Sequence, residues 1–221
     1  MKEHSRQSRR IVATEWDKLE DRYRQNLYDG LDEVGQVNQH YTERPLLLVA
    51  AHSLNHYRDG NVKLADRWTG SAVEILAADT ESGYIIPTGK IPNWNSWDKR
   101  TDPFKSAIDT RATAGTFVLD FHGMSNTYDV DLCVGLGPSA GAVATRFAEY
   151  IALRLDDYKV SLNTPFSAEP PFTVTAYVQQ HTQADAVQLE IAARLRDPKD
   201  HIGDSVAFLE RLSAAIRDFD L

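Results

Sequence analysis

Short, continuous apolar runs alternate along the chain with longer segments of helical period. Such runs are typical of strands buried on both faces of a sheet. They predict strands over residues 45–51, 83–87, 115–121, 129–134, 173–178 and 186–191. Apolar residues at helical spacing predict helices over residues 13–34, 64–78, 103–111, 139–155 and 202–219. The alternation predicts a three-layer α/β fold of the hydrolase-like kind, with a mostly parallel or mixed central sheet and helices on both faces.

The segments between these elements give the domain organisation. No linker and no shift in composition divides the chain, so a single domain is predicted over residues 1–221. Residues 1–12 hold the only basic cluster and are expected to be a frayed terminus. Residues 88–103 are rich in Pro, Asn and Trp and predict a long ordered loop, a kind of loop that is usually functional. Its aromatic residues would form a lid or substrate wall, or simply pack the loop.

Charge and composition narrow the classes of partner. The formal net charge is −8, which argues against a general affinity for nucleic acid, because binding phosphates needs a basic surface. The single cysteine, Cys133, lies in an apolar run and is interpreted as a small buried hydrophobe. No stretch has the apolar length of a signal peptide or of a membrane span. We therefore expect a cytoplasmic protein that binds neither nucleic acid nor membrane.

Two histidines stand at the ends of predicted central strands. His52 follows the strand at 45–51, and His122 follows the strand at 115–121. Ligands of open α/β sheets bind beyond the carboxyl ends of the strands, so the two imidazoles are expected to meet there. A catalytic zinc site takes three protein ligands from histidine and carboxylate and leaves one position open. Asp66, at the start of the next predicted helix, is a candidate third ligand, with helix capping as the alternative.

Three further side chains are candidates for chemistry. Asp120 is predicted to point to the opposite face of its strand from His122 and to orient a ligand from behind. Glu190 closes the predicted strand at 186–191 and either pairs with a base such as Arg194 or acts in the cleft. His56 forms an H-x-x-x-H spacing with His52, but the glutamate of the zinc-binding motif is absent. We interpret His56 as a substrate or surface group rather than a ligand.

Three blocks in this order resemble the N-formylglutamate amidohydrolase family. The first is the apolar strand that ends in Ala51-His52-Ser53, followed by the Asp66 segment at 65–70. The second is the strand that ends in His122-Gly123-Met124-Ser125. The third comprises residues 163–166, 173–177 and the Gln188-Leu189-Glu190 ending. The likeness spans residues 45–196. Ala51 replaces the family's proline, Leu54 replaces a glycine, and the family's Asp-Asn-Arg stretch has only a loose counterpart at 92–95, so the substrate stays open.

The resemblance implies a fold similar to that of zinc carboxypeptidases and aspartoacylase, and a set of roles. His52, Asp66 and His122 would hold a divalent metal, with zinc expected, and Glu190 would serve as general base. A cation would hold a carboxylate of the substrate, and an amide would orient its carbonyl or tail. The candidates for these substrate contacts are Arg58, Arg67, Asn95 and Arg194.

The resulting hypothesis is a metal-dependent hydrolase that cleaves an amide or formamide bond of an N-acyl or N-formyl amino acid or a related small molecule. Its partner would be a small molecule that carries an amide and a carboxylate, and a homo-oligomer is compatible with the sequence. Two alternatives stay open because fold-level analogy does not fix function. One is a non-catalytic binding or accessory protein on the same fold, and the other is a metallo-carboxypeptidase that acts on peptides.

Overall fold

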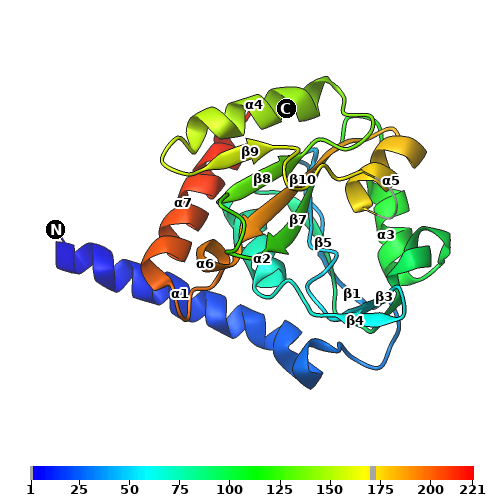
Figure 1. The fold of residues 1–221 in the computed structure, drawn as a ribbon, viewed down its shortest axis with the longest axis horizontal. Helices are drawn as coiled ribbons and strands as arrows, with labels where there is room; N and C mark the ends of the chain where they lie inside the picture. Colours follow the sequence, from blue (N-terminus) through cyan, green and yellow to red (C-terminus); the bar gives the residue numbers. More distant parts are fainter. Residues whose placement is uncertain (1, 170–172) are drawn as a thin grey trace.

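A seven-stranded mixed sheet forms the centre of the molecule (Figure 1). The computed structural model describes residues 2–169 and 173–221. The strands stand in the order β1-β5-β2-β7-β10-β8-β9. They are β1 (Val37–His40), β2 (Leu46–Val49), β5 (Gly83–Pro87), β7 (Phe117–Met124), β8 (Leu132–Gly135), β9 (Val160–Leu162) and β10 (Asp185–Ala192). The central strands β5, β2, β7 and β10 are parallel, whereas β1 pairs antiparallel with β5 and β8 pairs antiparallel with β10; β9 pairs parallel with β8. The predicted α/β class with a mixed sheet is confirmed.

Helices cover both faces of this sheet. They are α1 (Lys2–Arg24), α2 (Thr69–Asp79), α3 (Pro103–Arg111), α4 (Ala142–Arg154), α5 (Val174–His181), α6 (Ala193–Arg196) and α7 (Ile202–Asp218). Phe117 of β7 packs against Phe147 of α4, on the same side as α7 and α2. Asp120 of β7 accepts a hydrogen bond from Thr175 of α5, on the opposite side. This division follows from the period of two along a strand. Across the described residues, none of the helices is long and apolar enough to cross a membrane.

A second, three-stranded sheet stands beside the carboxyl ends of the central strands. Its order is β4-β3-β6, with β3 at His56–Arg58, β4 at Asn61–Lys63 and β6 at Ile91–Asn93. Two short turns of 3-10 helix complete the structure, η1 (Gln25–Tyr28) and η2 (Trp94–Lys99). The segment predicted as a loop over 88–103 therefore contains β6 and η2. Strands of three residues are too short to show a period in the sequence.

One predicted strand is a helix. Residues 173–178 are rich in Thr and Val, which favour strands, yet the segment forms α5. Thr173 caps this helix by accepting a hydrogen bond from the Ala176 amide at 3.0 Å. Its buried residues, among them Val174 and Val178, pack on the sheet. Tertiary packing and the cap outweigh the local propensity here.

Helices α1 and α2 differ most from their predicted limits. The first begins at Lys2 rather than at residue 13, since residues 2–12 contain good helix formers and neither Pro nor Gly. It ends at Arg24, because Asn26, Leu27 and Tyr28 adopt positive φ angles. Helix α2 begins at Thr69 and not at residue 64, because Trp68 has a φ of 71°. Asp66 consequently lies before the helix instead of in its first turn.

Candidate metal centre and active site

Three potential metal ligands converge at the carboxyl ends of β2 and β7. The Nδ1 atoms of His52 and His122 are 3.1 Å apart. Oδ2 of Asp66 lies 3.7 Å from Nδ1 of His52 and 3.5 Å from Nδ1 of His122. Both histidines are buried, and the Asp66 side chain is mostly buried. The structure therefore brings the three predicted ligands into one cluster that can hold a metal ion.

The fold explains why these side chains meet. Strands β2 and β7 are parallel neighbours in which Val49 pairs with Asp120, so residues just beyond Val49 lie beside His122. His52 occupies the turn that follows β2. Asp66 belongs to the connection between β4 and α2, and its amide donates a 2.8 Å hydrogen bond to the His52 carbonyl. The ligands thus come from a turn, a strand and an irregular segment, all at the carboxyl ends of the central strands.

The donor atoms fit a divalent ion. Zinc–nitrogen and zinc–oxygen bonds of about 2.0–2.1 Å in a tetrahedron place neighbouring donors about 3.4 Å apart. The three measured separations, from 3.1 to 3.7 Å, bracket this value. Two imidazoles and one carboxylate also match the donor set of catalytic zinc sites, in which a fourth position stays open.

The charges around the cluster favour a cation. Burial lowers the pKa of His52 well below its usual range, so this imidazole is neutral, the form that binds a metal. Burial opposes ionisation of Asp66, but hydrogen bonds with His122 and His52 hold its pKa well below the usual range. Burial also lowers the pKa of His122, but the neighbouring acidic groups Asp120, Asp66 and Glu190 together outweigh it and raise this pKa well above its usual range, so a metal ion that binds Nδ1 has to displace a proton from it.

Asp120 supports His122 from behind. Its Oδ1 lies 3.0 Å from Nε2 of His122, and its Oδ2 accepts hydrogen bonds from the amide and hydroxyl of Thr175 at 3.2 and 3.3 Å. The prediction that Asp120 points to the opposite face was wrong, because residues two apart along a strand share a face. A proton held on Nε2 by this ion-pair contact would leave the Nδ1 lone pair of His122 for the cluster.

Glu190 lies next to this cluster. It pairs in register with His122 across β10 and β7, and its Oε1 accepts a 2.9 Å hydrogen bond from the side-chain Nε2 of Gln188. Burial raises the pKa of Glu190 to about 7. The alternative pairing with Arg194 is not found, because Arg194 is bound to Asp131 at 2.5 Å. A buried carboxyl group with this pKa can exchange protons near neutral pH.

A pocket of about 740 Å³ opens over these residues. His52, Asp66, His122, Gln188 and Glu190 line it together with His56, Arg58, Lys63, Tyr128 and Phe166. Arg58 and Lys63 come from the β3–β4 hairpin and give one wall a positive charge. A larger hollow of about 960 Å³ between α1, α2 and α7 contains none of the cluster residues.

The other three predicted substrate contacts do not line this pocket. Arg67 is exposed, with its guanidinium 5.3 Å from the ring of Tyr28. Asn95 is bound to Asp59, with its side-chain nitrogen 2.6 Å from Oδ1 of that residue. Arg194 forms the ion pair with Asp131. Each of these side chains has a partner outside the pocket, and a role in substrate binding stays a prediction for all three.

Two residues of the pocket differ from the sequence prediction. Gln188 was not singled out, and His56 was expected to be a substrate or surface group. Gln188 stands two residues before Glu190 on a strand, and this spacing is the signal that the two share a face. His56 is buried, and its ring stacks on that of His52 with centroids 4.1 Å apart. Burial lowers the pKa of His56 to about 4, so it is neutral. It lies in the pocket wall beside the cluster, not at the surface.

The aromatic residues of the predicted loop pack behind the histidines. Trp94 meets the His52 ring edge to face at 4.6 Å and stacks on Trp97 at 5.1 Å. Both tryptophans and Phe104 are buried. The structure therefore agrees with the packing alternative rather than with a lid, and these rings support the position of His52.

Comparison with known proteins identifies the fold. No protein-family model and no curated protein matches the chain. A bacteriophage poly-γ-glutamate hydrolase shares its fold with a TM-score of 0.55 and 13% identity, over 83% of this chain and 86% of that one. The N-formylglutamate amidohydrolase from Ralstonia eutropha JMP134 does so with a TM-score of 0.54 and 13% identity, over 83% and 96%. A zinc-free form of YNDL has a TM-score of 0.52 and 15% identity, over 84% and 91%. At these identities the likeness is one of fold.

Proposed function

We propose that this chain is a metal-dependent hydrolase that cleaves an amide or formamide bond of an N-acyl or N-formyl amino acid or a related small molecule. The observation that carries the proposal is the convergence of three donor atoms within 3.7 Å of one another, with Glu190 in the same pocket. Two proteins that share the fold are named as a poly-γ-glutamate hydrolase and an N-formylglutamate amidohydrolase, which supports hydrolysis as the reaction.

His52, Asp66 and His122 are the residues that would hold the ion, and zinc is the first candidate because it favours this donor set. A divalent ion bound there would polarise the substrate carbonyl and acidify a water molecule. Asp120 keeps His122 in the required tautomer through the contact at Nε2. Trp94 fixes the His52 ring from the side.

Glu190 is the proposed general base and acid. With a pKa near 7, its carboxylate takes a proton from the attacking water and returns it to the leaving nitrogen. Gln188 holds one oxygen of this carboxylate, which fixes its orientation toward the reacting atoms. Because Glu190 and His122 are neighbours on parallel strands, the proton-transferring group and the metal ligand stand side by side at the same end of the sheet.

Arg58 is the proposed contact for a carboxylate of the substrate. It is half-buried in the pocket wall, and a guanidinium binds a carboxylate through two parallel hydrogen bonds. Lys63 on the next strand adds positive charge to the same wall. A substrate with both an amide and a carboxylate would therefore span from the cluster to the β3–β4 hairpin.

The test is turnover by zinc-loaded protein of a panel of N-formyl amino acids, N-acyl amino acids and short peptides, followed as release of primary amine. The expected result is hydrolysis of N-acylated or N-formylated amino acids that is lost in Glu190→Gln. Turnover of peptides alone would favour a carboxypeptidase. A metal-bound protein without turnover on the whole panel would contradict the proposal and favour a binding protein.

A further inference from the structure

The ligand Asp66 belongs to a segment without regular secondary structure. Residues 64–68 connect β4 to α2, so no ladder of helix or sheet bonds holds the carboxylate in place. Three consecutive residues are instead fixed by groups from distant parts of the chain. The Asp66 amide donates to the His52 carbonyl at 2.8 Å, the Arg67 carbonyl accepts from Arg196, and the Trp68 amide donates to Oε1 of Glu20 at 2.7 Å.

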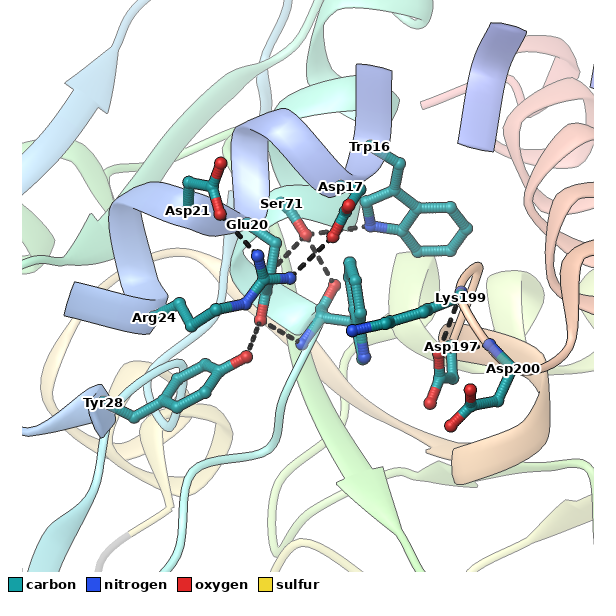
Figure 2. A network of polar contacts seen from close by, with 11 residues as sticks. Trp16, Asp17, Glu20, Asp21, Arg24, Tyr28, Ser71, Asp197, Lys199 and Asp200 are labelled. Atoms are coloured by element: carbon teal, nitrogen blue, oxygen red, sulfur yellow. Dashed lines mark hydrogen bonds and ion pairs between the residues drawn. The ribbon is translucent and has the colours of Figure 1, made fainter. Parts of the chain in front are cut away.

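Glu20 is the member of this set that comes from the N-terminal helix α1. It is 1% exposed, and it accepts two further hydrogen bonds, from Ser71 Oγ at 2.5 Å and from Tyr28 Oη at 2.9 Å. Figure 2 shows Glu20, Ser71 and Tyr28 directed at one another, with Trp16 beside Ser71. Burying a carboxylate is unfavourable unless donors surround it, and here three do.

The Trp68 backbone depends on this carboxylate. Trp68 has a φ of 71°, a conformation that is unfavourable for a residue with a Cβ atom and persists only where its surroundings hold it. Its amide, bound to Glu20, lies two residues after the ligand and directly before α2. The Glu20 contact therefore fixes the point at which the irregular segment joins the helix.

We propose that Glu20 is a positioning residue of the metal centre, which holds the Asp66 segment through the Trp68 amide and so makes metal affinity depend on helix α1. This inference rests on the proposed function, because it presumes that Asp66 binds the ion. Helix α1 lies outside residues 45–196, where the sequence resembles the hydrolase family, so the support for the ligand comes from a part of the chain with no such likeness.

The experiment measures the zinc dissociation constant of the full chain by competition with a chromogenic chelator. Glu20→Leu removes every acceptor oxygen while filling the space, and Glu20→Gln keeps one oxygen for the Trp68 amide. Glu74→Gln is the matched control, because Glu74 also joins α1 to α2, but through Arg22 at 2.6 Å and Tyr23 at 2.7 Å rather than through residues 66–68. Circular dichroism of each metal-free protein checks folding.

The expected result is zinc binding about tenfold weaker in Glu20→Leu, the low end of the effect of residues that support ligands. Glu20→Gln and Glu74→Gln should bind as the wild type does. Unchanged affinity in Glu20→Leu, or an equal loss in Glu74→Gln, would overturn the inference and leave the proposed function standing. A wild type that binds no zinc would overturn both. If Glu20→Leu does not fold, amide exchange in the metal-free wild type decides: protection of the Trp68 amide is expected, and exchange at the rate of an exposed loop would overturn the inference.

Discussion

Replacing Asp120 by Asn is the sharpest single test of how the metal histidine is held. Asp120 is fully buried, contacts Nε2 of His122 at 3.0 Å and accepts two hydrogen bonds from Thr175. The substitution keeps the volume but turns one acceptor into a donor. If the new amide nitrogen faces His122, it favours the tautomer that carries its proton on Nδ1. A protonated Nδ1 cannot bind a metal.

The size of the effect follows from these two contacts. With the amide nitrogen toward His122, the loss of the supporting carboxylate should weaken metal binding about 10- to 100-fold, or about 1.4–2.7 kcal/mol. With the side chain flipped, the Thr175 amide loses its acceptor, and the free energy of unfolding of the metal-free protein should fall by about 1–3 kcal/mol. Either orientation carries a penalty, so at least one of the two quantities must change.

The assay combines zinc competition titrations with denaturant unfolding of the metal-free protein. Asp185→Asn is a suitable control, because Asp185 lies on the neighbouring strand β10 but accepts hydrogen bonds from the amides of Gly141 and Ala144, away from the cluster. Its zinc affinity should equal that of the wild type. The reasoning is refuted if Asp120→Asn leaves both zinc affinity and the free energy of unfolding unchanged.

Three further predictions follow from the site and its surroundings. Glu190→Gln should retain zinc while kcat falls about 10²- to 10⁴-fold, as measured by amine release; unaltered turnover would exclude it as the base. Arg58→Gln should raise KM for carboxylate-bearing substrates, whereas Arg194→Gln, outside the pocket, should not; equal effects would argue against a carboxylate contact at Arg58. Burial raises the pKa of Glu20 above its value in the unfolded chain. The free energy of unfolding of the wild type should therefore fall relative to that of Glu20→Gln as the pH rises through the folded-state pKa of Glu20. Denaturant unfolding at several pH values checks this, and a pH-independent difference between the two proteins would contradict it.

The parts of the fold that the sequence predicted are those with strong local signals. The continuous apolar runs of β2 and β10 mark strands buried on both faces, and the predicted limits of β5 and α3 match the structure. The strand predicted over residues 173–178 was wrong, because the segment forms helix α5. Its β-branched residues follow their tertiary packing and not their strand propensity.

The sequence predicted the part of the site that lies at the ends of the central strands. His52 follows β2 and His122 lies near the carboxyl end of the parallel neighbour β7, a relation that apolar runs and chain order suggest. Arg67, Asn95 and Arg194 lie outside the pocket with partners from distant segments, a placement that the sequence does not reveal. Glu20 went unnoticed for the same reason, since its contact at Trp68 lies 48 positions away.

The metal content of the purified protein tests the central claim most directly. Elemental analysis after reconstitution with zinc and removal of the excess should find about one ion per chain in the wild type and in Glu190→Gln, and much less in His52→Ala and His122→Ala. A wild type without bound metal, or histidine variants that keep the full amount, would contradict the assignment of this cluster as the centre of the active site.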